Sequence, residues 1–386
     1  MEPLPVISLF SGVGGLDMAV EKCAEPPLVQ DRTPGPYRIA VATDYDRKAL
    51  EVLRLNFRST PTICGDIRSI SSAELMDAAG IGLGEAGLVI GGPPCTPFSK
   101  SGFWLEEKRE SRDPDASLLD EFVRVVGECQ PQGFVLENVQ ALTYRTHATR
   151  FSRLLRGLED VGYSVGFKVL IAADFGVPQL RRRVFVIGRR DRGLLMMPQP
   201  THSGWSERDK SVDLSRLPYV TAKEAIGDLL PGIPEDGEIA EGTFGQHLAE
   251  VPAGENYLWH TERGGGRNMW KWRSRYWTFL LKLDPDRPAS TIQAQPGPWV
   301  GPFHWDNVDT PSAPRARRLR IPEMKRLMTF PDSFEIDGRR ADVQRQLGNA
   351  VPVELGKAVT RSLAISLGHL ASDQHGVVLP DQLVLV

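Results

Sequence analysis

Cys95 lies in a segment whose neighbours would hold one side chain rigidly in place. The apolar run 88–90 is typical of a buried parallel strand, and it ends at Gly91-Gly92-Pro93-Pro94. Glycines allow unusual dihedral angles, whereas two consecutive prolines stiffen the chain and remove two amide donors. Cys95 is therefore expected at the carboxyl end of a strand, where open α/β sheets place their chemistry. A lone cysteine is usually an inert buried thiol, but the rigid turn before this one favours a nucleophile.

Three further charged side chains flank apolar strands farther along the chain. Glu137 follows directly after the apolar run 133–136, and a carboxylate in that position is costly unless it has a partner or a function. Arg181 and Arg183 alternate just before the apolar run 184–188, so both face the same side of an extended segment. A basic run is usually a solvated surface, but its position between a Val-Pro pair and a buried strand argues against that here.

The amino-terminal part of the chain supplies elements that could hold a nucleotide-type cofactor. An apolar strand at 6–10 leads into a turn that contains Gly12, Gly14 and Gly15, and a helix is predicted to begin near Asp17. Such a turn lets a cofactor lie against bare backbone amides at a helix N-terminus. The spacing does not match G-x-G-x-x-G, so a dinucleotide site is less favoured.

Acidic residues follow the next two predicted strands. Asp44 comes after the strand 37–42, where an acid can bind two ribose hydroxyls, and the adjacent Tyr45 could stack on an adenine. Asp44 could also cap the helix predicted at 47–56, and the two roles are compatible. Asp66 follows a third short strand and could accept a hydrogen bond from an adenine amino group. Three strand ends in this order are more specific than any one of them.

Composition limits the class of protein. The chain has 386 residues, of which 41% are hydrophobic and 25% charged, enough for a sizeable core and two domains. The formal net charge is −3, so any surface that binds nucleic acid must be local. None of the four cysteines stands in a C-x-x-C pair, which argues against a metal site or a disulfide framework. Long apolar runs and a signal pattern are missing, so we expect a cytoplasmic protein without membrane contact.

The periodicity of the sequence changes along the chain and predicts three segments. Alternating strands and helices over 1–190 predict an α/β fold with a doubly wound, mostly parallel sheet, which would be the catalytic and cofactor-binding domain. Over 191–312 regular periodicity fades and Pro, Gly and Trp become frequent, so we expect a second, smaller and irregular recognition domain. The segment 313–386 makes up the third part of the chain.

Basic and aromatic residues interleave within the irregular segment, between Trp259 and Lys282. Basic side chains can position phosphates, while aromatic rings and the glycine turn 264–266 can approach bases. The alternative is a small domain with an aromatic core of its own, and we expect some of each. The basic residues expected to contact nucleic acid are Arg263, Arg267, Lys271, Arg273 and Arg275.

Taken in order, these motifs resemble those of bacterial cytosine-5 DNA methyltransferases. Pro-Pro-Cys followed by Phe-Ser resembles the family's nucleophile loop, Glu137-Asn138-Val139 its second catalytic motif, and the Gln-x-Arg-x-Arg of 179–183 its third. The F-x-G-x-G-G turn after the first strand resembles the element that holds S-adenosylmethionine. The Gly-Asn-x-Val-Pro of 348–352 resembles the family's last motif, and the resemblance covers nearly the whole chain.

The resemblance implies a reaction and a site. The reaction is transfer of a methyl group from S-adenosylmethionine to carbon 5 of a flipped-out cytosine in a specific sequence of double-stranded DNA. Cys95 would add to carbon 6, Glu137 would hold ring nitrogen 3, and Arg183 would hold the base carbonyl, with Arg181 ordering the site. The implied cofactor-binding residues are Phe10, Ser11, Gly12, Gly14, Gly15, Asp44, Tyr45, Asp66, Ile67, Pro93, Leu118, Asn349 and Val351. Ser99 and Ser101 are expected to contact DNA. The implied fold has a terminal antiparallel strand, target recognition in the domain 191–312, and a hinge and return to the catalytic domain in 313–386.

Two positions depart from the family pattern, and other functions stay open. Asp44 stands where the family more often has Glu, and Thr96 stands where a Gln is common. One alternative is an RNA cytosine-5 methyltransferase, which is disfavoured because the chain has no cysteine after Cys129. Another is a catalytically inactive DNA-binding regulator, which the presence of Cys95 and Glu137 argues against. We expect a monomer that could be paired with a restriction enzyme or other defence proteins.

Overall fold

The computed structural model describes residues 2–25, 35–94, 118–204, 212–229, 237–271, 276–311, 313–371 and 376–378. By packing, the chain divides into two compact units. Unit 1 comprises Met1–Ile171, Arg182–Pro200 and Val351–Val386, and unit 2 comprises Ala172–Arg181 and Thr201–Ala350. The three functional segments expected from the sequence remain predictions.

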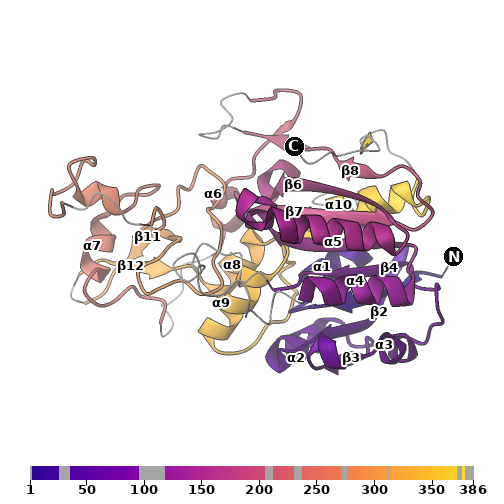
Figure 1. The fold of residues 1–386 in the computed structure, drawn as a ribbon. Coiled ribbons are helices and arrows are strands. Elements are labelled where there is room, and N and C mark those ends of the chain that lie inside the picture. The colour runs from indigo at the N-terminus through magenta and orange to yellow at the C-terminus, as the bar shows by residue number, and fades with distance from the viewer. Residues whose placement is uncertain are drawn as a thin grey trace. The chain divides into compact units, whose positions relative to one another are not determined.

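A seven-stranded sheet forms the centre of unit 1 (Figure 1), with the strand order β3-β2-β1-β4-β5-β7-β6. The first five strands of that order pair in parallel, whereas β7 runs antiparallel to both of its neighbours, β5 and β6. This is the expected doubly wound α/β sheet, with the antiparallel strand one position in from the edge. The strands are β1 (Leu4–Leu9), β2 (Tyr37–Asp44), β3 (Thr62–Cys64), β4 (Leu88–Gly91), β5 (Gly133–Val139), β6 (Ser164–Ile171) and β7 (Arg182–Arg189).

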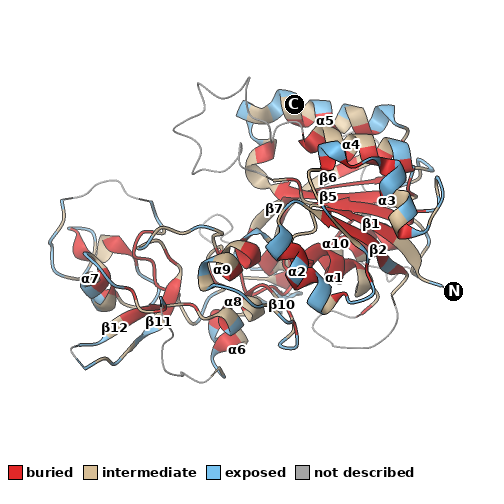
Figure 2. Cartoon of the chain, turned by 90° about the horizontal axis from the view of Figure 1, so that it is seen from below, coloured by how far each residue is buried: buried red, intermediate tan, exposed pale blue. Residues whose placement is uncertain are grey.

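Helices cover both faces of this sheet. Figure 2 shows α3, α4 and α5 on one face and α1, α2 and α10 on the other, with the strands between them buried. Helix α10 packs on α1 so closely that a Cβ on Gly356 would lie 2.6 Å from the Cβ of Ala19. The carboxyl-terminal helix therefore returns to the first βα unit. The helices are α1 (Gly15–Glu21), α2 (Arg47–Asn56), α3 (Ser72–Ala79), α4 (Leu118–Cys129), α5 (Ala148–Asp160) and α10 (Val353–Ser366).

Local sequence explains where these elements begin and what they bury. Asp46 caps α2, because its side chain accepts a hydrogen bond from the amide of Lys48 at 3.1 Å. The capping role considered for Asp44 is therefore wrong, since its neighbour two residues on performs it. Helix α4 places its apolar residues on one face, and Phe122 packs edge-on against Phe134 of β5 at 6.0 Å between ring centroids.

Unit 2 is irregular and has a separate aromatic core. The ring of Phe244 lies at the centre of this core and contacts Trp270, Phe279 and Trp299 edge-on. The elements of unit 2 are short, because Pro and Gly interrupt regular pairing. These elements are β9 (His202–Ser203), β10 (Leu217–Pro218), α6 (Ala222–Ile226), α7 (Gly245–Glu250), β11 (Phe303–Val308), β12 (Arg315–Arg318), α8 (Ile321–Leu327) and α9 (Arg340–Asn349). In unit 1, β8 (Met196–Pro198) pairs antiparallel with β13 (Gly376–Val378).

Two kinds of feature are missing from the described residues. None of their helices is long and apolar enough to cross a membrane. Nor do they contain a group of three or more His, Cys, Asp or Glu side chains that could hold a metal ion.

Candidate active site

Glu137 and Arg183 form a partly buried ion pair in unit 1. The two residues lie on the neighbouring antiparallel strands β5 and β7, where Arg183 is opposite Val139 and thus diagonal to Glu137 on the same face. Nε of Arg183 lies 2.8 Å from Oε1 of Glu137, and the two side chains are 14% and 9% exposed. The guanidinium compensates the carboxylate, which explains why a charge is tolerated at the end of an apolar strand.

The loop after β4 is fastened beside this pair. Nδ2 of Asn138 donates to the carbonyl of Pro93 at 3.1 Å, and the Oδ1 of Asn138 accepts from the Val139 amide at 2.9 Å. A Cβ on Gly92 would lie 3.3 Å from Oε2 of Glu137, so a glycine lets the loop pass close to the carboxylate. The Pro-Pro turn thus lies next to the Glu137–Arg183 pair, as expected for an anchor that directs the following residue.

The predicted nucleophile Cys95 and the loop residues Ser99 and Ser101 lie outside the described residues. Pro93 and Pro94, which precede Cys95 directly, are described and lie at the end of β4. The position of the turn is therefore known, and the role of Cys95 remains a prediction.

Arg181 belongs to unit 2, where its side chain is almost fully buried. Its guanidinium donates to the carbonyls of Gly348 at 2.8 Å, Ala350 at 3.0 Å and Ile292 at 3.4 Å. Gln179 is buried beside it and donates to the Leu327 carbonyl at 3.1 Å. These bonds give Arg181 a positioning task, consistent with the ordering role that the resemblance implies. The pattern of alternating arginines could not show it, because its partners are backbone atoms distant in sequence.

The glycine turn after β1 has the geometry of a cofactor cradle. Phe10, Gly12 and Gly14 have φ values of 53°, 54° and 90°, and these left-handed conformations fold the chain tightly over the strand end. A Cβ on Gly14 would lie 2.7 Å from the ring of Phe57, so that position requires glycine. The side chain of Ser11 points back and donates to Oγ of Ser8 at 2.8 Å.

Asp44 ties this turn to the end of β2. Its Oδ2 accepts from the amide of Gly12 at 2.8 Å, and its Oδ1 accepts from the amide of Asp46 at 2.8 Å. Burial raises the pKa of Asp44 above its ordinary value. Tyr45 beside it is 76% exposed, so its ring is available to a ligand. The structure therefore brings together the turn 10–15 and Asp44 with its neighbouring aromatic residue.

Asp66 has a local partner that the sequence did not suggest. Its carboxylate accepts from the amide of Arg68 at 3.0 Å and from Nε of Arg68 at 2.9 Å, and these bonds lower the pKa of Asp66. Asp66 thus caps the short turn that begins with the buried Ile67. An adenine amino group would have to share this acceptor with Arg68.

The remaining expected cofactor residues fall in different places. Leu118 is the first residue of α4 and is buried in the core of unit 1. Val351 is buried in unit 1 near Gly356 of α10, whereas Asn349 ends α9 in unit 2. Unit 1 therefore contains the turn, Asp44, Pro93, Leu118 and Val351.

The turn 10–15 and the neighbouring Asp44 and Tyr45 of unit 1 are suited to bind S-adenosylmethionine. The turn 10–15 presents backbone atoms without bulky side chains, and Asp44 with Tyr45 supplies an acid and an exposed ring beside it.

One buried acid in the helix after the turn was not anticipated as a site residue. Asp17 is 1% exposed and neither carboxyl oxygen has a hydrogen-bond partner among the described residues. Burial raises the pKa of Asp17 to about 7, and the sequence signal was an acid within the apolar run that opens α1.

The basic and aromatic residues of unit 2 divide between surface and core. Arg263, Arg267 and Lys271 are exposed, and Arg267 pairs with Glu250. The tryptophans at 259 and 270 pack against the aromatic core, whereas Tyr276 and Trp277 are 63% and 59% exposed. The expected aromatic core is therefore confirmed for these two tryptophans, whereas approach of the exposed rings to bases stays a prediction. Arg273 and Arg275 lie outside the described residues.

Comparison with known proteins places these features in context. The family model for C-5 cytosine-specific DNA methylase matches residues 4–364. The chain is 62% identical over 380 residues to the Type II methyltransferase M.SacI of Streptomyces achromogenes, covering 98% of this chain and 97% of that protein. It is 30% identical over 369 residues to the Type II methyltransferase M.MthTI of Methanothermobacter thermautotrophicus, covering 93% and 97%. The solved structure of the Dnmt2 methyltransferase of S. pombe has the same fold, with a TM-score of 0.61 at 19% identity, covering 94% of this chain and 98% of that one.

Proposed function

The chain belongs to the C-5 cytosine-specific DNA methylase family, and from this premise we propose which of its residues perform the methyl transfer and in which setting. It is a DNA cytosine-5 methyltransferase, and S-adenosylmethionine is its methyl donor. RNA methylation and an inactive regulator are not favoured, because the matching model is that of a DNA methylase and a relative 62% identical over 380 residues is a Type II methyltransferase.

Carbon 5 of cytosine is a poor nucleophile, so it must first be activated. We assign this step to Cys95, whose thiolate adds to carbon 6 and makes carbon 5 enamine-like. A free cysteine is mostly protonated at neutral pH, so the site must favour the thiolate locally. The anchored turn before Cys95 supports this assignment, because the bond from Asn138 to the Pro93 carbonyl holds the end of β4 against the neighbouring strand.

Glu137 and Arg183 are assigned to the base. Glu137, in protonated form or sharing a proton with ring nitrogen 3, neutralises the negative charge that develops there when sulfur adds to carbon 6, and it takes this proton back when the thiolate leaves. Arg183 donates to the base carbonyl oxygen. The distance of 2.8 Å between their side chains supports the assignment, since one planar pyrimidine edge presents both acceptors side by side. Arg181 and Asn138 are positioning residues, because both act through backbone carbonyls.

The bonds balance over the cycle. The sulfur–carbon 6 bond forms as the carbon 5–carbon 6 double bond opens, which makes carbon 5 nucleophilic. S-adenosylmethionine would supply the methyl group to carbon 5, and its sulfonium–methyl bond would break to leave S-adenosylhomocysteine. A base, such as water, then removes the carbon 5 proton, and the electron pair expels the Cys95 thiolate. None of these steps is accessible inside the DNA stack, so the cytosine must be flipped out. Ser99 and Ser101 are candidates to fill the vacated space, and Arg263, Arg267, Lys271, Arg273 and Arg275 to contact the duplex.

The setting that we propose is a Type II restriction–modification system in the cytoplasm. The Type II names of the relatives support it, and the extent of identity to M.SacI makes a shared target sequence the first to test. The partner would be a restriction enzyme that cleaves the unmethylated sequence.

The single observation that carries the assignment of residues is the Glu137–Arg183 pair beside the anchored turn. The test is transfer of labelled methyl groups from S-adenosylmethionine to genomic DNA, followed by nucleoside analysis and bisulfite sequencing. Wild type should produce 5-methylcytosine at one sequence, and Glu137→Gln and Arg183→Met should lower kcat by about 10²-fold or more. A control substitution at Asp160, exposed on α5, should leave kcat unchanged. Full activity of both site variants would remove the assignment, whereas labelled RNA without labelled DNA would remove the proposed substrate.

A further inference from the structure

The arginines in and beside β12 of unit 2 differ in their ion pairs among the described residues. Arg317 of β12 is buried and donates to both carboxyl oxygens of Glu323, at 2.9 and 2.7 Å. Arg320 lies 3.2 Å from Glu238, which is also buried. These pairs satisfy each other inside the unit, as buried charges must. They are therefore part of the packing of unit 2.

Arg318 lies between these residues in sequence but has a different environment. Successive residues of a strand point to opposite faces, so Arg318 leaves β12 on the side away from Arg317. Its guanidinium lies over the ring of Phe303, 5.2 Å from the centroid, and donates to the carbonyl of Pro298. No carboxylate pairs with Arg318 among the described residues.

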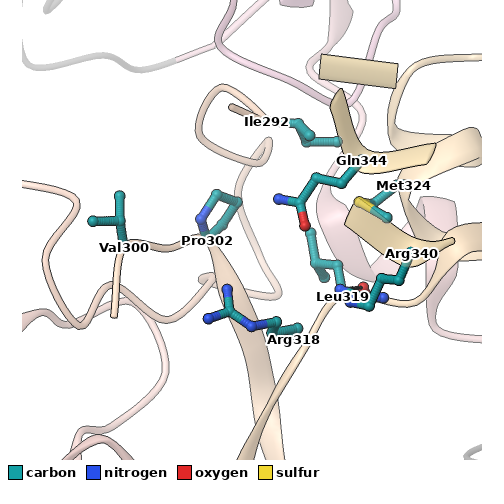
Figure 3. A pocket seen from close by; sticks show the side chains of 8 residues that line it. All are labelled: Ile292, Val300, Pro302, Arg318, Leu319, Met324, Arg340 and Gln344. Carbon is teal, nitrogen blue, oxygen red and sulfur yellow. Dashed lines mark hydrogen bonds between the residues drawn. The ribbon is translucent and has the colours of Figure 1, made fainter. Parts of the chain in front are cut away.

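A second arginine makes the charge at this point stronger. Arg318 and Arg340 line one small pocket together with Gln344, and apolar side chains such as Pro302 complete it. In Figure 3 the guanidinium of Arg318 and the amide of Gln344 both turn toward Pro302. Arg340 donates to the Leu319 carbonyl and lies 4.0 Å from Glu238. Burial and the charge of Arg340 lower the pKa of Arg318.

The guanidinium of Arg318 carries a charge that no ion pair with a carboxylate compensates among the described residues. His304 adds no charge at neutral pH, because burial lowers its pKa to about 4. A guanidinium that lies over a ring and has one N–H bonded to a carbonyl still has further N–H donors at its edge. That edge suits a phosphate oxygen.

We propose that Arg318, with Arg340 behind it, binds a phosphodiester of the DNA backbone. This rests on the proposed function, since it takes DNA as the ligand of unit 2, and it adds a site outside the aromatic and basic segment 259–282. A backbone contact of this kind fixes the register of the protein on the duplex and is independent of base sequence.

The experiment measures the affinity for duplex DNA as a function of salt concentration. Wild type is compared with Arg318→Met, which keeps the apolar stem over Phe303, with Arg318→Lys, which keeps the charge, and with Lys223→Ala. Lys223 is exposed on α6 of the same unit and controls for the loss of one positive charge. Specific and unrelated duplexes are measured in parallel.

Arg318→Met should lower the salt slope by about one and weaken binding about tenfold at low salt, equally for both duplexes. Arg318→Lys should keep the slope while losing part of the affinity, and Lys223→Ala should behave as wild type. An unchanged slope in Arg318→Met, or an equal loss in Lys223→Ala, would overturn the proposal. If Arg318→Met does not fold, Arg318→Lys serves as the test variant in its place. A lower salt slope of DNA binding in Arg318→Lys, which keeps the positive charge, would then overturn the proposal.

A second arm separates DNA phosphate from free phosphate. Inorganic phosphate at constant ionic strength should compete weakly and equally against wild type and Arg318→Met. Thermal stabilisation of wild type alone by inorganic phosphate, with unchanged DNA slopes, would assign the site to a free anion and overturn the DNA contact. Absence of DNA binding by wild type would instead contradict the proposed function, so the two failures are distinguishable.

Discussion

Replacing Asp17 with asparagine should change how the stability of this protein depends on pH. Asp17 lies beneath the glycine turn, is fully buried, and has no hydrogen-bond partner for either oxygen among the described residues. Burial raises its pKa from 3.8 to about 7, and the negative charges of Glu21 and Asp44 act in the same direction. Asparagine has nearly the same shape but does not ionise.

The direction in which the unfolding free energy changes with pH follows from the number of protons that the folded and unfolded states bind. Between pH 3.8 and about 7 the folded protein keeps a proton on Asp17 that the unfolded chain has released, so stability falls as pH rises through this window. Each pH unit within it corresponds to about 1.4 kcal/mol. Between about pH 5 and pH 8, wild type should therefore lose about 2.5 kcal/mol of unfolding free energy that Asp17→Asn does not lose. Above about pH 7, the pKa of Asp17 in the folded protein, the difference in unfolding free energy between wild type and Asp17→Asn should become constant.

Urea unfolding of both proteins at several pH values measures this difference directly, provided that the m value stays the same. Asp160→Asn, an exposed acid on α5, is the matched control and should track wild type at every pH. A wild-type minus Asp17→Asn difference that is equal at pH 5 and pH 8 would refute the reasoning, because Asp17 would then keep the same protonation in both states.

Three further predictions test the cradle, the anchor and His369, whose Nδ1 lies 2.8 Å from the Tyr37 hydroxyl. Gly14→Ala should raise the Kd for S-adenosylmethionine in calorimetry at least tenfold, because the new Cβ meets the Phe57 ring at 2.7 Å and φ is 90°; an unchanged Kd would contradict the cradle. Asn138→Ala should lower kcat about tenfold in steady-state assays with little change in KM for S-adenosylmethionine, since it frees the Pro93 carbonyl, and an effect on KM alone would exclude the anchoring role. Burial lowers the pKa of His369, so as pH falls the unfolded chain takes up a proton before the folded protein does, and the stability of the fold should decrease below about pH 6.5. In thermal melts, His369→Gln should lose less stability than wild type over this pH range. An identical loss in the variant would disprove this prediction.

Local patterns in the sequence were sufficient for most of the sheet. Helix α2 begins and ends where expected at 47–56, because its apolar spacing and its polar flanks are both local signals. The cap at Asp46 was missed, since both Asp44 and Asp46 stand just before the helix and only the backbone conformation selects between them.

Contacts between distant segments were the part that the sequence could not supply. Glu137 and Arg183 could each be placed next to an apolar strand, but their 2.8 Å approach depends on β7 pairing antiparallel with β5, which no local pattern encodes. Similarly, the arginines 315–320 are typical of a solvated basic surface, and the structure shows that Arg317 is buried with Glu323 while Arg318 faces elsewhere. The difference arises from strand alternation together with partners far along the chain.

The central claim is that Cys95 forms a covalent bond to the target cytosine before carbon 5 is methylated. A duplex with 5-fluorocytosine at the target tests it most directly, because a proton can leave carbon 5 after methyl transfer and fluorine cannot leave as a cation. The account predicts an enzyme–DNA adduct that survives denaturing electrophoresis, requires S-adenosylmethionine, is absent in Cys95→Ser and forms more slowly in Glu137→Gln. An adduct that persists in Cys95→Ser, or efficient methylation of ordinary cytosine by that variant, would contradict it.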